Sequence, residues 1–170
     1  PQGLQSGLTP SPRLTCSLLS YSPDGSCLFA ASEAGECHLW PGEHAFRVTG
    51  KPLTAHFSAD GRRLVVVTDQ GQATIWSDQG RPAGPTLLAT AACLDPKGQQ
   101  ILWIDRKREA FEMPLAGGPR RALGRAQSLA YLGSTAVTDG WLKGWERTRF
   151  SADGSCLAAI QGRRLQLFDS

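Results

Sequence analysis

One short pattern recurs along the chain at a nearly constant interval, and this repetition limits the folds that the chain can adopt. The pattern reads SPDGSCLFAASEAGECHLW from residue 22, SADGRRLVVVTDQGQATIW from residue 58 and SADGSCLAAIQGRRLQLF from residue 151. With the turn glycine as the anchor, Gly25, Gly61 and Gly98 follow one another at intervals of 36 and 37 residues. A period of this length is typical of solenoids, propellers and other repeat arrays, in which each repeat is one supersecondary unit.

Between these glycines the chain alternates short apolar runs with turn residues. In the first unit the runs CSLLSYS, CLFAAS and CHLW are separated by SPDG and EAGE, and the second unit follows the same plan. Short runs of β-branched, aromatic and aliphatic residues bounded by Gly and Asp predict strands joined by hairpins. No segment carries an apolar stripe at the helical period over ten or more residues. The sequence therefore predicts an all-β fold with three strands in each clear unit, and the residues before the next unit can add a fourth.

The repeats divide the chain into a lead-in and five units. Residues 1–13 are rich in turn residues and are interpreted as a lead-in or as the end of a preceding unit. The third unit keeps its turn as DPKG but loses the Asp before Gly, the fourth is short and degenerate, and the fifth stops after its third strand. The predicted units span residues 14–50, 51–87, 88–124, 125–147 and 148–170.

Composition excludes several classes of protein. A chain of 170 residues that is 41% hydrophobic and 19% charged is typical of a globular domain with one core. The formal charge of +3 is small and the basic clusters are short groups of two or three residues, which does not favour nucleic-acid binding. No apolar run approaches the ~20 residues that span a bilayer, so no membrane partner is expected.

The five cysteines favour reduced thiols over disulfides or zinc ligands. They are Cys16, Cys27, Cys37, Cys93 and Cys156, and none forms a CxxC pair. Most lie among apolar residues in predicted strands, where a free thiol behaves as a small hydrophobic group. Because disulfides are rare in the cytosol and nucleus, this usage predicts a cytoplasmic or nuclear location.

The repeat resembles that of the WD-repeat family. In the first unit the resemblance rests on Ser22 to Gly25, Leu28, Ser32, Gly35 and Leu39-Trp40, and the second and last units match at most of the same places. It implies a β-propeller or partial propeller of about four to five four-stranded antiparallel blades. The structural repeat positions that it marks are Asp24, Gly25, Trp40, Asp60, Gly61, Trp76, Gly98, Asp153, Gly154 and Phe168.

The chain also departs from the family pattern. The Gly-His pair near the start of each blade is missing, and Pro41 and Ser77 stand where the family has Asp after the tryptophan. The family's internal hydrogen-bond network therefore does not carry over, and blade stability is expected to rest on packing, with Trp40 and Trp76 between blades. Four to five units either close as a small propeller or belong to a larger ring. The second interpretation is favoured because the ends of a repeat array need caps.

No catalytic or metal-binding constellation is evident. Asp24, Asp60 and Asp153 recur at one place in the turn, where Asp bonds its own backbone, so they are interpreted as structural. The three histidines are spaced too irregularly for a metal motif, and neither a G-x-S-x-G elbow nor a phosphate-binding loop occurs. We therefore expect no enzyme activity, no metal and no cofactor.

The expected function is a non-enzymatic scaffold or sensor that contacts other proteins. The WD-repeat resemblance implies such roles, often as part of a larger signalling or NTPase protein, so the remaining blades of a parent protein are also expected partners. The predicted contact residues lie where the repeat is least regular and combine Trp with Lys and Arg: Trp141, Lys143, Trp145 and Arg147.

Two alternatives to the scaffold stay open. One is a propeller that binds a small molecule or peptide near its axis or is associated with an enzyme. It predicts a pocket with converging polar groups. The other is a contribution to RNA binding in a ribonucleoprotein. It predicts that Arg62, Arg63, Arg106, Lys107 and Arg108 gather on one face.

Overall fold

Every regular element that the structure describes is a β-strand. The computed structural model of the chain describes residues 15–126 and, beyond them, residues 129–132, 135–138, 147–150, 156–161 and 164–169. The prediction of an all-β chain is confirmed. In chain order the strands are β1 (Cys16–Tyr21), β2 (Leu28–Ser32), β3 (Glu36–Trp40), β4 (His44–Arg47), β5 (Pro52–Phe57), β6 (Arg63–Thr68), β7 (Gln72–Ser77), β8 (Leu87–Leu88), β9 (Ala91–Leu94), β10 (Gln100–Ile104), β11 (Glu109–Pro114), β12 (Arg121–Arg125), β13 (Leu129–Leu132), β14 (Thr135–Thr138), β15 (Arg147–Phe150), β16 (Cys156–Gln161) and β17 (Arg164–Asp169).

The strands form five antiparallel sheets, and in each sheet neighbouring strands are also neighbours in the chain. The first three sheets, β1–β4, β5–β8 and β9–β12, have four strands each. The fourth sheet is the pair β13–β14, and the fifth is β15–β17. Each sheet is therefore a meander of hairpins, as the recurring turns predicted.

The first turn of each of the first three sheets is held by a small side chain that binds backbone groups. Ser22 Oγ donates to Asp24 Oδ1 over 2.6 Å and accepts from the Cys27 N–H over 2.8 Å. Gly25 follows with a φ of 71°, a left-handed conformation that glycine adopts without steric cost. The same arrangement recurs in the second sheet at Ser58 and Asp60. The sequence pattern Ser-x-Asp-Gly thus fixes where one strand ends and the next begins.

The third sheet builds this turn with a different residue. Asp95 takes the place of the serine, and its Oδ1 accepts from the Gln100 N–H over 2.6 Å. Its carbonyl accepts from the Gly98 N–H over 2.9 Å, and Gly98 has a φ of 63°. The loss of Asp before Gly in DPKG therefore does not remove the turn, because the carboxylate has moved to the first turn position.

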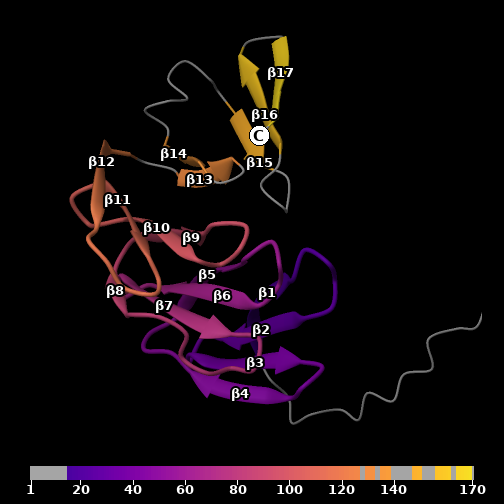
Figure 1. Cartoon of the computed structure of the whole chain (residues 1–170). Helices are drawn as coiled ribbons and strands as arrows, with labels where there is room; N and C mark the ends of the chain where they lie inside the picture. The colour runs from indigo at the N-terminus through magenta and orange to yellow at the C-terminus, as the bar shows by residue number, and fades with distance from the viewer. Residues whose placement is uncertain are drawn as a thin grey trace, which may run out of the picture.

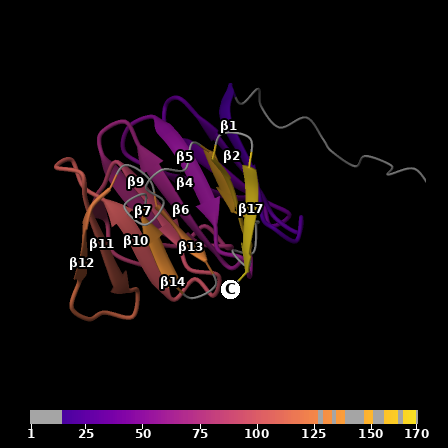
Figure 2. The ribbon, with the colours of Figure 1, turned by 90° about the horizontal axis from the view of Figure 1, so that it is seen from above.

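Successive sheets pack through their first strands. Strand β1 lies against β5, β5 and β6 against β9, β9 and β10 against β13, and β13 against β15. Figure 1 shows the sheets following one another from β1–β4 to β15–β17, with the first sheet at one end of the row. Seen from above, β11 and β12 lie at one side of the molecule and β17 at the other (Figure 2). The first strand of each sheet is thus the inner strand of an arc of blades.

The contact between the first two sheets is apolar and contains an aromatic stack. Phe29 and Leu39 from the first sheet and Leu64 from the second are fully buried in it. The rings of Phe46 and Trp76 stack across the boundary with their centroids 4.1 Å apart. A second cluster joins the second and third sheets and includes Trp103, which stacks on Phe111 at 5.4 Å. Neighbouring blades thus bury apolar faces that neither could bury alone.

Candidate protein-interaction face on the first sheet

The first sheet carries a second apolar face, on the side away from the second sheet. Cross-strand register places Leu19, Ala30 and His38 in one row and Tyr21, Leu28 and Trp40 in the next. These six residues are called the open face from here on. The alternating residues of the same strands, such as Phe29 and Leu39, belong to the cluster with the second sheet, so the open face points the other way.

The large side chains of the open face reach solvent. Leu19 is 61% exposed and Tyr21 67% exposed. The rings of His38 and Trp40 stack with centroids 5.7 Å apart, and both side chains are half-buried. Contiguous exposed apolar surface of this kind marks an interaction site in a folded protein, whereas single exposed apolar residues carry no such meaning.

Trp40 does not lie where the sequence placed it. We expected Trp40 and Trp76 to pack between blades, and Trp76 does so in the cluster of the first and second sheets. Trp40 lies on the open face instead, because it pairs with Leu28 in a row whose side chains point away from the second sheet. The prediction for Trp40 is therefore wrong within the structure described here.

The rim of the open face is polar. Glu36 and Arg47 are cross-strand partners at the outer strand and form an ion pair of 3.6 Å. Both side chains are more than half exposed, so the pair contributes little to stability. An apolar centre with a charged rim is the usual anatomy of a protein–protein interface.

Comparison with known proteins identifies the fold. No family model matches the chain, and no curated protein matches it. Among solved structures, the chain is similar to the Cps50 (Swd1) beta-propeller domain of Myceliophteria thermophila, with 15% identity and a TM-score of 0.68, over 94% of this chain and 66% of that one. It is also similar to the dihydro-heme d1 dehydrogenase NirN in complex with DHE, with 18% identity and a TM-score of 0.54, over 95% of this chain and 36% of that one.

The chain folds as a partial β-propeller. The likeness covers nearly the whole chain but only about two thirds of the Swd1 domain and about a third of NirN. At these identities it establishes the fold alone. The Swd1 structure is a beta-propeller domain and NirN is a dehydrogenase, so the fold alone does not fix a function.

Most of the residues that the sequence predicted as a partner-binding site lie outside the described residues. This applies to Trp141, Lys143 and Trp145, while Arg147 begins strand β15. Of the repeat positions, Asp153 and Gly154 also lie outside, and Phe168 pairs with Leu157 in the fifth sheet. The contact at these residues thus stays a prediction. The open face was missed by sequence reasoning, although its apolar character is visible in the alternate residues of β1 and β2.

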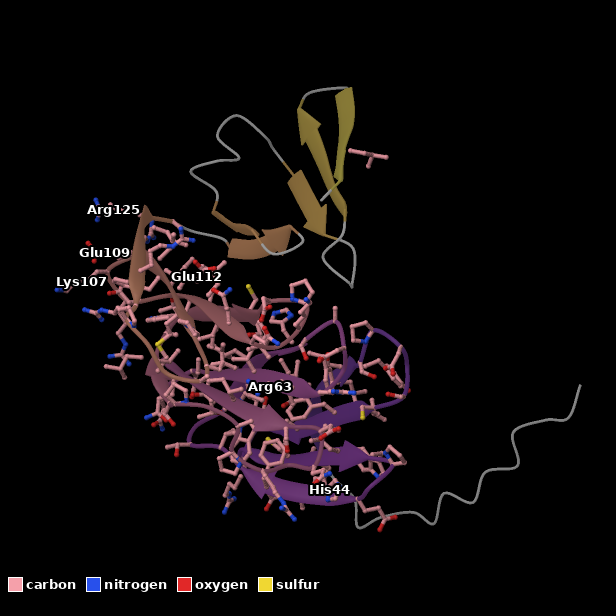
Figure 3. All side chains as sticks on the ribbon, viewed as in Figure 1. His44, Arg63, Lys107, Glu109, Glu112 and Arg125 are labelled. Carbon is pink, nitrogen blue, oxygen red and sulfur yellow. The ribbon has the colours of Figure 1, made fainter. Side chains whose placement is uncertain are left out.

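The five basic residues named for RNA binding do not form one patch. Arg63 Nη1 donates to the Gly98 carbonyl at the start of β10 over 2.7 Å, and Arg106, beyond the end of β10, donates through Nη2 to the Gln70 carbonyl over 2.6 Å. The two groups therefore lie at opposite ends of the strands, and Figure 3 shows Arg63 and Lys107 in separate parts of the molecule. The gathering that the RNA alternative predicted is wrong for Arg62, Arg63, Arg106, Lys107 and Arg108.

The environments of two thiols, Cys37 and Cys93, disfavour the thiolate form. Burial raises the pKa of Cys37 to about 12. Burial, and secondarily the Asp95 carboxylate, raises the pKa of Cys93 above its usual value. A thiol is a nucleophile only as the thiolate, so both remain inert at neutral pH.

Neither a metal-binding group nor a membrane-spanning helix is found in the described part of the chain. It holds no group of three or more His, Cys, Asp or Glu side chains that could bind a metal. None of these described residues forms a helix that is long and apolar enough to cross a bilayer. An open hollow of about 450 Å³ lies beside Ser17 and Ser32, but its two carboxylates, Glu33 and Glu36, are paired with Lys51 and Arg47.

Proposed function

We propose that the partial propeller is a non-enzymatic module for protein–protein contact. The observation that carries this proposal is the open face, where Leu19 and Tyr21 are more than 60% exposed around a half-buried Trp40. Tyr and Trp supply large, rigid contact surfaces and are enriched among residues that dominate binding energy. The WD-repeat resemblance supports the same role, since scaffolds and sensors are common in that family.

The proposal extends to location and to a second contact. Cys16, Cys27, Cys37 and Cys93 are free thiols, which supports the cytoplasm or nucleus. The predicted contact through Trp141, Lys143, Trp145 and Arg147 is retained as part of the proposal. It is independent of the open face and is tested separately by Trp141→Ala combined with Trp145→Ala.

Site-directed photo-crosslinking tests the proposal. A benzophenone side chain placed at position 21 of the full chain is expected to form adducts with protein in a cell extract. The same group at Leu88, an equally exposed leucine on the outer strand β8, is the matched control. Adducts specific to position 21 that Leu19→Asp abolishes support the proposal. Equal labelling from both positions contradicts a contact at the open face.

A further inference from the structure

The open face has buried counterparts elsewhere in the same molecule. A shift of 36 residues superposes the turn Ser22–Gly25 on Ser58–Gly61 and carries each open-face position onto a position of the second sheet. Leu19, Tyr21, Leu28, Ala30 and Trp40 then correspond to Ala55, Phe57, Leu64, Val66 and Trp76. Each of these five counterparts belongs to, or packs against, the cluster that buries the second sheet against the first.

The third sheet repeats this relationship. The shift of 37 residues from Gly61 to Gly98 carries the same five positions onto Ala92, Leu94, Ile101, Trp103 and Met113. Each of these residues belongs to, or packs against, the cluster that buries the third sheet against the second. In the second and third sheets, these positions are thus covered by the preceding sheet. In the first sheet, no described sheet covers them.

The profile of the open face also resembles that of its covered counterpart. Leu28 and Leu64 are identical, as are Trp40 and Trp76, and Tyr21 replaces Phe57. The cross-strand pair Leu19 and Ala30 corresponds to the pair Ala55 and Val66. The larger residue is thus on the first strand in the first sheet and on the second strand in the second sheet. An interface that accepts Ala beside Val needs little adjustment to accept Leu beside Ala, because the combined volume of the pair changes by about one methylene.

We propose that the open face is the seat of a further four-stranded antiparallel blade that continues the arc. Its contact surface would be like the one that the first sheet presents to the second, which is formed by Leu18, Phe29, Ala31, Leu39 and Phe46. The inference rests on the proposed function, since it names the kind of protein surface that the open face accepts. Continuity with two existing blade interfaces favours a blade over a helix or an isolated peptide strand.

A tandem duplication tests the proposal in the full chain. Residues 16–51 are repeated ahead of Cys16, which preserves the natural spacing because Lys51 precedes Pro52 at the equivalent junction. A four-stranded sheet that packs on nothing is not stable alone, so the added copy resists protease only if the open face seats it. We expect the added copy to be trimmed at least about tenfold more slowly than in the same chain with Leu19→Asp and Tyr21→Asp in the original copy.

Three controls decide the outcome. Leu88→Asp in the extended chain should leave the slow trimming unchanged, and the unextended chain with Leu19→Asp and Tyr21→Asp should unfold at the wild-type temperature. Equal trimming with and without the two substitutions overturns the proposal. Concentration-dependent dimers of the unextended wild type that Tyr21→Asp abolishes also overturn it, in favour of a second copy. The proposed function fails differently, by the loss of position-specific adducts at residue 21 while the added blade stays protected.

Discussion

The ring of Phe46 in the first sheet stacks on the indole of Trp76 in the second, with centroids 4.1 Å apart and planes inclined by 25°. The two residues lie 30 positions apart in the sequence, on β4 and β7. Their contact joins the outer strand β4 of the first blade to the third strand β7 of the second, whereas β1 and β5 join the inner strands. The blade interface is therefore closed at both ends by apolar packing.

Trp76 and Trp40 occupy equivalent repeat positions but should differ in their effect on stability. We expect Trp76→Ala to lower the free energy of unfolding by about 3 kcal/mol, because it removes an aromatic ring from a blade interface. Trp40→Ala should cost about 1 kcal/mol or less, since Trp40 lies on the open face. Urea unfolding followed by circular dichroism measures both. Equal losses would contradict the assignment of the two environments.

Arg63 should contribute to the junction of the second and third sheets while Arg62 should not. The Arg63 guanidinium donates to the Gly98 carbonyl, and a hydrogen bond from a charged group contributes about 1.5 kcal/mol. We expect Arg63→Met to lower the free energy of unfolding by about that amount. The neighbouring Arg62 side chain is exposed, so Arg62→Met is the control and should have almost no effect. A larger effect of Arg62→Met would contradict this account.

The carboxyl group of Asp24 should titrate unusually low. Hydrogen bonds from the Ser22 hydroxyl, then from Ser26, lower its pKa to about 2 from the ordinary value of 3.8. The ionised form is therefore stabilised in the folded chain, and this contribution is present above pH 3.8 and is lost as the pH falls toward 2. Carboxyl chemical shifts measured by NMR should give this pKa, and Ser22→Ala should raise it. A pKa near 3.8 in the wild type would contradict the proposed turn structure.

Alanine substitutions at Gly35 and Gly25 should distinguish the cost of steric crowding from the cost of backbone strain. A Cβ at Gly35 would lie 2.4 Å from the Val48 carbonyl oxygen, whereas a Cβ at Gly25 would meet nothing within 4 Å. Both glycines have positive φ, 80° and 71°. Gly25→Ala should therefore cost about 1 kcal/mol, the strain of the left-handed conformation alone. Gly35→Ala should cost about 3 kcal/mol or more, because backbone must move. Thermal denaturation of both variants measures the difference.

The sequence predicts the strands well because each is bounded by a turn with its own chemistry. Glycine at a left-handed position and a Ser or Asp side chain that binds the backbone are local requirements, so they are readable from local sequence. The role of Asp95 was not predicted, because the expected carboxylate had moved to the serine position of the turn. Asp, like Ser, has a side-chain oxygen that can accept a hydrogen bond from a backbone N–H, so the residue type at that position is enough to indicate the turn.

Residue environments that depend on neighbouring sheets were harder to predict. Trp40 and Trp76 look alike in the sequence, yet the environment of Trp40 is decided by the absence of a covering sheet in the described structure. Arg63 and Arg106 both belong to short basic stretches. They lie at opposite ends of the strands because of the direction in which the intervening strands run. Such facts follow from how blades are placed, which a local pattern does not encode.

Aromatic NOEs measured by NMR on the full chain test the order and packing of the blades most directly. We predict strong NOEs between the ring protons of Phe46 and Trp76, and NOEs from Trp40 to His38 but to no residue between 52 and 77. NOEs from Trp40 to that range, or none between Phe46 and Trp76, would contradict the arrangement of the first two sheets as successive blades with an open outer face.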